Sequence, residues 1–325
     1  MLSVISSKSP LVSVVMPAYN CERYVKQAID SIINQTYENW ELLVSDDCSN
    51  DKTRKIIDSY KDQRIKCYHN SINMGYLKTW NKLIALSRGE FITFQDADDW
   101  SSPNRIEIML EFLCANPKID VCGSNCFRVD VRGNIVADLS FPKNHDAIFQ
   151  AMPKHFFFVG SALMIKRIVY KTIGGYNVFF DRIGAEDLYW AYLIMEKYQM
   201  GNIPQVLYYY RNNPNSLSGN MANNPSKINI GNIISFLIED RKNRNTDYLQ
   251  EGKIVELHQM LTNLNKPFLD DVSYYYYYVA KRSFYEGKKI VALKLMCRAI
   301  LKRPFKWSYY KDLHYFYTHR DSSNE

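Results

Sequence analysis

The chain has 325 residues, enough for about two domains, and 46% of them are hydrophobic and 23% charged, as in ordinary globular proteins. This composition excludes a disordered, collagen-like or simple repeat protein. The net charge of +7 is concentrated near the end of the chain, because residues 281–320 contain eleven Lys or Arg and two acidic residues, whereas residues 1–280 are neutral overall.

Strands and helices alternate through the first 118 residues. Apolar runs predict strands at residues 12–16, 42–44, 65–69 and 91–94. Helices are predicted between and after them, at residues 24–33, up to residue 60, at 76–87 and from Pro103 onward. Because the strands are almost continuously apolar, we expect a mostly parallel central sheet with helices on both faces, the architecture of an α/β protein.

The alternation becomes irregular after residue 118. Further strands are predicted at residues 119–130, 160–165 and 203–211. A helix is expected to follow Glu186 and Asp187 and to continue to residue 198.

A segment rich in Pro, Asn and Ser, residues 214–226, is the clearest boundary in the sequence. Everything beyond it has a helical pattern. We therefore predict an α/β domain at residues 1–220, made of halves at about 10–118 and 119–220, and a helical region at residues 221–325.

Acidic residues follow two of the predicted strands. Asp46 and Asp47 end the second strand, and Asp96 and Asp98 follow the fourth. Ligands of open α/β sheets bind beyond the carboxyl ends of the strands. Residues two apart in an extended segment point the same way, and two facing carboxylates repel unless a cation lies between them. Oxygen ligands suit Mg²⁺ or Mn²⁺, so these residues are candidates for a metal site. The alternative to a metal site is a solvated acidic turn or a cap on the following helix.

A glycine-rich phosphate loop is missing from the first strand. None of the 13 glycines lies between residues 1 and 74, which excludes a dinucleotide fingerprint or a P-loop there. A phosphate bound at this sheet would therefore be held through a metal ion.

Several short motifs occur together in a fixed order. They are Val14–Asn20, Asp46–Asp51, Asn73–Gly75, Gly89–Ile92, Asp96–Asp99, Gly174–Tyr176 and Glu186-Asp187. This series resembles the inverting family 2 glycosyltransferases, which have the GT-A fold and act in bacterial surface-polysaccharide synthesis. The resemblance covers about residues 10–220.

The resemblance implies a UDP-sugar donor and assigns donor-side roles by position. Pro17 and Tyr19 would line the nucleotide pocket, and Asp47 would accept a hydrogen bond from uracil. Asn73 and Lys78 would lie near the nucleotide or its diphosphate.

The same resemblance implies the metal and the catalytic base. Asp98 would bind the Mn²⁺ or Mg²⁺ that bridges the diphosphate, and Asp96 would contact the ribose or a metal-bound water. Asp187 would be the base, with Glu186 as the rival candidate. Inversion by a single displacement needs one carboxylate to take the acceptor proton and a metal to stabilise the leaving diphosphate. An acidic pair at a helix start also stabilises the helix dipole without any catalytic role.

Three positions depart from the family pattern. Cys48 stands where the family usually has Gly, Trp80 where it often has Arg, and Asn213 where it often has a metal-binding His. Asn213 could still ligate through its amide oxygen, or water could take that place. These departures leave open an alternative, a non-catalytic sugar-nucleotide or surface-binding module that has lost activity.

The last segment is both basic and aromatic. Residues 274–278 are five consecutive Tyr, and further aromatic residues alternate with the basic ones of 281–320. In its last helix pair, one apolar face is expected to consist of Ile290, Leu293, Cys297 and Ile300. The segment is either a helical pair packed in the protein or a platform on an anionic membrane surface, where each basic residue contributes about 1 kcal/mol. No motif supports nucleic-acid binding.

The cellular location is predicted from what the sequence lacks. No run reaches the roughly 18–20 apolar residues of a spanning helix, and no signal-peptide pattern is present at the start. Seven Cys residues, an odd number, suggest reduced thiols. We expect a cytoplasmic enzyme, peripheral on the inner face of the cytoplasmic membrane, that acts on a glycan or lipid-linked glycan acceptor.

Overall fold

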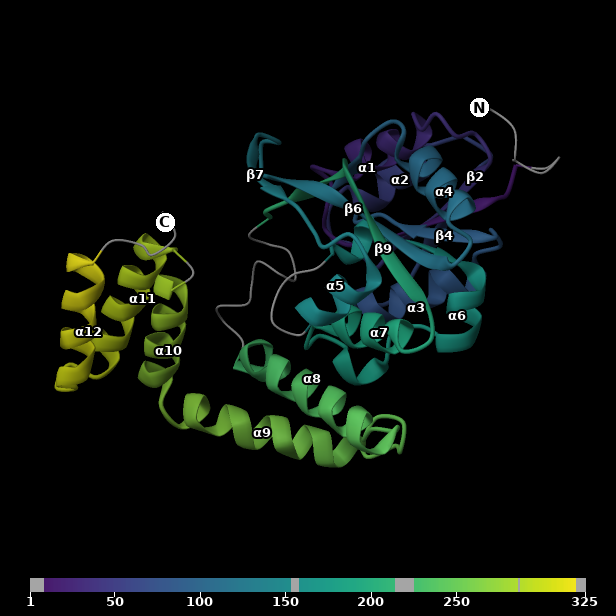
Figure 1. Cartoon of the computed structure of the whole chain (residues 1–325). Helices are drawn as coiled ribbons and strands as arrows, with labels where there is room; N and C mark the ends of the chain where they lie inside the picture. Colours follow the sequence, from purple (N-terminus) through teal and green to yellow (C-terminus); the bar gives the residue numbers. More distant parts are fainter. Residues whose placement is uncertain (1–8, 153–157, 214–224, 286, 320–325) are drawn as a thin grey trace. The chain divides into compact units, whose positions relative to one another are not determined.

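The chain forms two compact units, residues 1–216 and 217–325. The computed structural model describes residues 9–152, 158–213, 225–285 and 287–319 (Figure 1). The sequence-based boundary at residue 220 lies outside these described ranges.

The N-terminal unit is built on one twisted sheet. Its strands are β1 (Val12–Ala18), β2 (Trp40–Asp46), β3 (Ile65–His69), β4 (Phe91–Phe94), β5 (Trp100–Ser101), β6 (Ile119–Val129), β7 (Ile135–Leu139), β8 (Met164–Lys166) and β9 (Gln199–Arg211). They lie in the order β3-β2-β1-β4-β8-β6-β9-β5, with β7 paired to β6. The pairs among the first four strands are all parallel, as the alternating sequence pattern predicts.

The second half of the sheet is mixed. Strand β8 runs antiparallel to both β4 and β6, whereas β9 is parallel to β6 and antiparallel to β5. The expected parallel arrangement therefore describes β1 to β4, and the short antiparallel β8 joins them to the rest of the sheet. Only three residues of β8 are paired, which is too short a segment for hydrophobic periodicity to reveal its direction.

Helices cover both faces of this sheet, as expected. They are α1 (Val25–Ile33), α2 (Thr53–Asp58), α3 (Tyr76–Leu86), α4 (Arg105–Ala115), α5 (His145–Ala151), α6 (Arg167–Ile173) and α7 (Glu186–Met195), with 3₁₀ turns η1 (Gly160–Ala162) and η2 (Val178–Phe180). Helices α1, α2 and α4 share one core with alternate residues of β1 and β2. Figure 1 shows α3, α6 and α7 on the opposite side of the sheet.

The C-terminal unit is helical throughout its described residues, as predicted. Its helices are α8 (Pro225–Arg244), α9 (Ile254–Asp270), α10 (Val272–Tyr285), α11 (Lys289–Lys302) and α12 (Trp307–Thr318). Aromatic side chains of α10 and α12 fill its core, including Tyr275, Phe284, Tyr309 and Phe316. Part of the tyrosine run is therefore interior packing.

The buried face of α11 differs from the predicted one. Its buried residues are Ala292, Leu295, Met296 and Ala299, whereas Ile290 is 70% exposed. The prediction was therefore only partly right, because Leu293 and Ile300 pack against the core while Cys297 is exposed like Ile290. The small alanines allow closer helix packing, and α10 and α11 lie against each other along their length.

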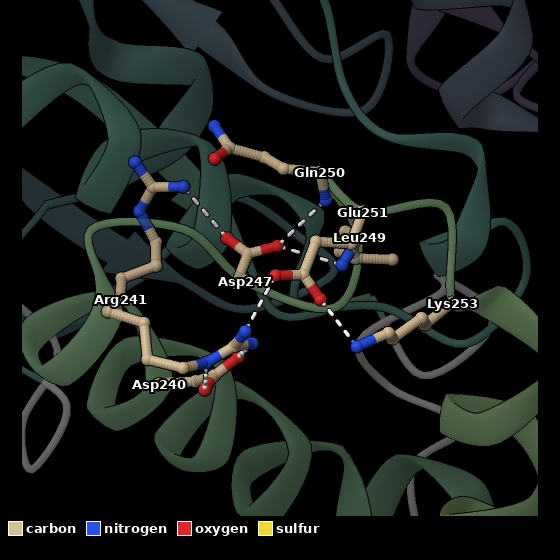
Figure 2. A network of polar contacts seen from close by, with 8 residues as sticks. Asp240, Arg241, Asp247, Leu249, Gln250, Glu251 and Lys253 are labelled. Atoms are coloured by element: carbon tan, nitrogen blue, oxygen red, sulfur yellow. Dashed lines mark hydrogen bonds and ion pairs between the residues drawn. The ribbon is translucent and has the colours of Figure 1, made fainter.

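A buried ion pair stabilises the turn between α8 and α9 (Figure 2). Asp247 is fully buried and accepts hydrogen bonds from Arg241 Nη1 at 2.9 Å and from the backbone N–H of Leu249 at 2.8 Å. A second, more exposed set joins Arg244 and Lys253 to Glu251 at 2.6 and 2.7 Å.

Replacing Asp247 should destabilise this unit. In Asp247→Ala the Arg241 guanidinium stays buried without its carboxylate, which is expected to lower the free energy of unfolding by about 3–5 kcal/mol. Denaturant unfolding measures the change. Asp270→Ala removes an exposed carboxylate of the same unit and should stay within about 0.5 kcal/mol of the wild type. Equal stability of the two variants would contradict the stabilising role of the Arg241–Asp247 ion pair.

Candidate active site

The acidic turn after β4 lies at the carboxyl end of the strand, where Asp99 is buried and Asp96 and Asp98 are partly exposed. Burial raises the pKa of Asp96 to about 7, and the neighbouring charge of Asp98 adds to that rise. Burial also raises the pKa values of Asp98 and Asp99. The turn is therefore more than a solvated acidic loop, because each ionised carboxylate here would be stabilised by a nearby cation.

Arg211, at the end of β9, fixes this turn from outside. Its Nε donates to the Asp98 carbonyl oxygen and its backbone N–H donates to Asp99 Oδ1, both at 2.7 Å. The guanidinium is stacked between the rings of Tyr24 and Trp100, at 4.4 and 4.9 Å from their centroids. From the sequence, Arg211 had no role beyond the end of a predicted strand, so its positioning role emerges from the geometry.

Arg105, the first residue of α4, fixes the same turn from inside. The side chain is fully buried, and its Nη2 donates to Thr93 Oγ1, the Phe94 carbonyl and the Ser161 carbonyl at 2.8, 3.0 and 2.8 Å. Its Nη1 donates to Ser101 Oγ at 2.9 Å. Ser101 thus serves this network, and α4 begins without a side-chain cap.

Asp47 is anchored within the protein at the end of β2. Its Oδ1 accepts from Asn70 Nδ2 and the Met74 backbone N–H at 2.7 and 2.8 Å, and its Oδ2 accepts from the Gly75 N–H at 2.8 Å. Its carboxylate therefore holds residues 70–75 in place. Asp46 instead accepts from the Ser49 N–H within its own turn.

The loops after β1 and β2 are joined to each other. Pro17 lies opposite Ser45 in the sheet, and Tyr19, just beyond, is 46% exposed. The Asn20 N–H donates to Ser49 Oγ at 2.9 Å. Cys48 has φ of 62°, so this chain adopts with Cys the left-handed conformation for which glycine is suited.

Asp187 lies in the first turn of α7 and faces η1. A Cβ added to Gly160 would lie 3.3 Å from Asp187 Oδ2, so glycine leaves room for this carboxyl. Burial raises the pKa of Asp187, and its charge contributes to the raised pKa of Asp96. The sequence-predicted base and the sequence-predicted metal-side carboxylate therefore lie within electrostatic reach of each other.

Glu186 belongs to the same buried region. The pKa of Tyr76, raised mainly by burial, is raised further by the charges of Asp96, Glu186 and Asp187. The site therefore brings residues from β4 and α7 together beside the first residue of α3.

Asn73 and Lys78 already have partners in the protein. Lys78 Nζ lies 2.6 Å from Asp181 Oδ2, and Arg182 Nη2 donates to Asn73 Oδ1 at 2.9 Å. Both partners precede Glu186 by only a few residues. The two predicted donor-side residues are therefore linked to the loop that leads into α7.

Trp80 belongs to the core and makes no surface for a phosphate. It is fully buried and stacked on Tyr176 at 4.0 Å between ring centroids. The adjacent Asn81 donates to the Tyr176 carbonyl and accepts from its N–H, both at 2.8 Å. Trp80, one of the three departures from the family pattern, thus packs under Tyr176 and supports the Gly174–Tyr176 segment.

The side chains around Asp98 do not by themselves complete a cation site in the described residues. The Asn213 amide nitrogen donates to Asp98 Oδ2 at 3.0 Å, so this side chain lies beside the predicted ligand. Among the residues that the structure describes, no three His, Cys, Asp or Glu side chains are grouped to hold a metal ion. A cation on Asp98 and Asp96 would therefore need other oxygen ligands, such as an amide, water or a diphosphate.

Comparison with known proteins identifies the family. The model of glycosyl transferase family 2 matches residues 13–174. EpsE of Bacillus subtilis (strain 168), named as a glycosyltransferase, is 32% identical over 213 residues, which cover 63% of this chain and 74% of EpsE. The chain belongs to glycosyltransferase family 2. Its activity class, predicted from the motif series, is confirmed.

A further relative and a solved structure agree with this family 2 assignment. WfaP of Escherichia coli, a UDP-Glc:alpha-D-GlcNAc-diphosphoundecaprenol beta-1,3-glucosyltransferase, is 29% identical over 65% of this chain and 80% of its own. The crystal structure of S. aureus TarS residues 1–349 in complex with UDP-GlcNAc has a TM-score of 0.59 at 16% identity, covering 94% of this chain and 91% of that chain. The expected GT-A fold is confirmed. In the described part of this glycosyltransferase, no helix has the length and apolar character of a membrane span.

Cys48→Gly should stabilise this family 2 enzyme. The left-handed conformation costs an L-residue about 1–2 kcal/mol, and the larger backbone entropy of unfolded glycine offsets about half of that gain. We expect the free energy of unfolding to rise by about 0.5–1 kcal/mol in denaturant titrations. Cys48→Ala, which removes the thiol and keeps the strain, is the matched control. A gain in that variant equal to the gain in Cys48→Gly would contradict the explanation.

Proposed function

We propose that the protein is an inverting transferase that moves a sugar from a UDP-sugar to a hydroxyl group of its acceptor. The observation that carries this proposal is that Asp96 and Asp98 after β4 and Asp187 at the start of α7 are all partly buried and lie within electrostatic reach of one another. A single displacement requires one carboxylate group near the diphosphate and another near the attacking hydroxyl. The site supplies both from different elements.

The donor is proposed to bind across the carboxyl ends of β1, β2 and β4. Tyr19 and Pro17 would contact the nucleoside, and Asp47 would use its remaining lone pairs to accept from uracil. Asp98 and Asp96 would hold Mn²⁺ or Mg²⁺, which when bound neutralises the charge of the leaving diphosphate. Arg211 would keep the Asp98 backbone in position for this role.

Asp187 is proposed as the catalytic base, with Glu186 as the rival. The Asp187 carboxylate would accept the proton of the acceptor hydroxyl. At the same time the oxygen of that hydroxyl would form the bond to the anomeric carbon, and UDP would leave. A raised pKa makes Asp187 a better proton acceptor than an exposed aspartate, provided that it is ionised at the working pH.

A lipid-linked glycan is the proposed acceptor. The support is the name of WfaP, whose acceptor is a sugar diphosphoundecaprenol. A GlcNAc-diphospholipid analogue with UDP-glucose is therefore the first substrate pair to try. A protein that binds UDP and never turns over would instead be the inactive binding module that the departures at residues 48, 80 and 213 left open.

Two carboxylate variants test the chemistry. Asp187→Asn should lower kcat by about 10²–10⁴-fold, because the proton acceptor is lost, while UDP affinity stays near the wild-type value. Asp98→Ala should weaken UDP binding in Mn²⁺ by at least about tenfold, since a metal ligand is lost. UDP release measures kcat, and calorimetry measures UDP affinity.

Glu111→Gln, at an exposed site on α4, is the matched control for loss of one carboxylate. It should retain both UDP binding and turnover. Full activity in Asp187→Asn would leave Glu186 as the base. Full activity in Glu186→Gln as well would overturn the mechanism.

The C-terminal unit is proposed to attach the enzyme to an anionic membrane surface. Leu301, Phe305 and Trp307, at the turn between α11 and α12, are 81%, 92% and 83% exposed. Lys302, beside them, is also exposed. Large apolar side chains beside basic ones match the interface of an anionic bilayer.

Vesicle binding tests this attachment. The double variant Phe305→Ser/Trp307→Ser should bind vesicles of phosphatidylglycerol at least about tenfold more weakly, because each buried aromatic side chain contributes roughly 1.5–3 kcal/mol. Val255→Ser on α9, where Val255 is 79% exposed, is the control for a lost apolar surface residue. Sedimentation with vesicles gives the bound fraction, and unchanged binding by the double variant would end the proposal.

A further inference from the structure

The loop from Asp181 to Ala185 leads directly into the helix that carries Glu186 and Asp187. Its backbone is unusual, since Arg182 and Ala185 have φ of 61° and 66°, and Gly184 has φ of 94°. A left-handed conformation costs an L-residue about 1–2 kcal/mol. Two such residues so close together need contacts from elsewhere to hold them.

Those contacts come from the segment between β3 and α3. Arg182 Nη2 donates to both the carbonyl oxygen and Oδ1 of Asn73, at 3.1 and 2.9 Å. Lys78 Nζ forms its ion pair with Asp181 Oδ2 at 2.6 Å, and the Asp181 side chain is only 15% exposed. The two elements are therefore joined at two points by charged groups.

Glycine at position 75 makes this approach possible. A Cβ on Gly75 would lie 2.9 Å from Asp181 Oδ1, closer than real Cβ contacts allow, and its φ is 90°. The same Gly75 donates its N–H to Asp47. The 181–185 loop is thus packed against a segment that β2 already holds rigid.

We propose that Asp181 and Arg182 are positioning residues that link the donor side of the site to the base. This inference rests on the proposed function, in which Asn73 and Lys78 lie at the nucleotide or its diphosphate. Arg182 holds the loop in its left-handed conformation, so that α7 begins with Asp187 facing the site. Asp181 neutralises Lys78 and competes with the diphosphate for its ammonium group.

The two residues should therefore affect different kinetic constants. Without the Asp181 charge, Lys78 is fully available to an anionic donor, so donor affinity should increase. Without Arg182, the loop loses its hydrogen bonds to Asn73 and Asp187 is held less firmly, so kcat should fall while donor affinity changes little. A residue that only stabilises the fold would not separate the two quantities.

The experiment compares Asp181→Asn and Arg182→Ala in the full chain. UDP affinity in Mn²⁺ is measured by calorimetry, and kcat is measured as UDP release from UDP-glucose or UDP-GlcNAc, whichever the wild type uses. Asp181→Asn should bind UDP at least threefold more tightly. Arg182→Ala should lose about tenfold in kcat with a UDP Kd within twofold of the wild type.

A rescue variant and a control complete the test. Adding Ala185→Gly to Arg182→Ala should restore most of the lost kcat, because glycine adopts positive φ without the Cβ penalty. Lys171→Ala, which removes an exposed cation on α6, should match the wild type throughout.

The outcomes separate this inference from the proposed function. An active wild type with Arg182→Ala within twofold of its kcat overturns the positioning role alone. Parallel loss of kcat, UDP affinity and melting temperature in Arg182→Ala also overturns it, since the residue would then be merely structural. A wild type that neither binds UDP nor releases it from either donor overturns the proposed function, and this inference with it.

Discussion

The buried guanidinium of Arg105 is the interaction on which the N-terminal unit depends. It binds the end of β4, the η1 turn and Ser101 at once, and so joins residues 94–105 to the η1 turn, more than 50 residues later in the chain. Because the cation is wholly removed from water, each of its hydrogen bonds must be kept or the desolvation cost is left uncompensated. The positions of the acidic turn and of Gly160, which faces Asp187, follow from that requirement.

Charge balance explains why the site can hold so many buried carboxyl groups. Arg105 lies beneath the acidic turn, Arg211 binds its backbone from the other side, and the remaining excess of negative charge is what a divalent cation would neutralise. The cations of this unit that touch the acidic turn are occupied by protein partners.

The local sequence pattern was sufficient to predict those parts of the fold that are marked by a run of one residue type. The four parallel strands, α1 and the strand-end carboxylates could be predicted, since apolar runs and acidic pairs are visible in sequence. Arg105 and Arg211 could not, because an arginine buried by tertiary hydrogen bonds has the same local context as an exposed one. The buried face of α11 was predicted only in part, because Ala292 and Ala299 give little apolar signal in the sequence.

The anchoring of Asp47 has a consequence for the thermodynamics of donor binding. Three protein hydrogen bonds fix the orientation of its carboxylate in advance, so a nucleobase that accepted this geometry would not have to freeze a free side chain. The saving in conformational entropy extends to residues 70–75, which the same carboxylate holds. In its proposed donor-binding role, Asp47 would therefore matter by two routes, as an acceptor for the base and as the anchor of residues 70–75, and the second would apply to donors with any base.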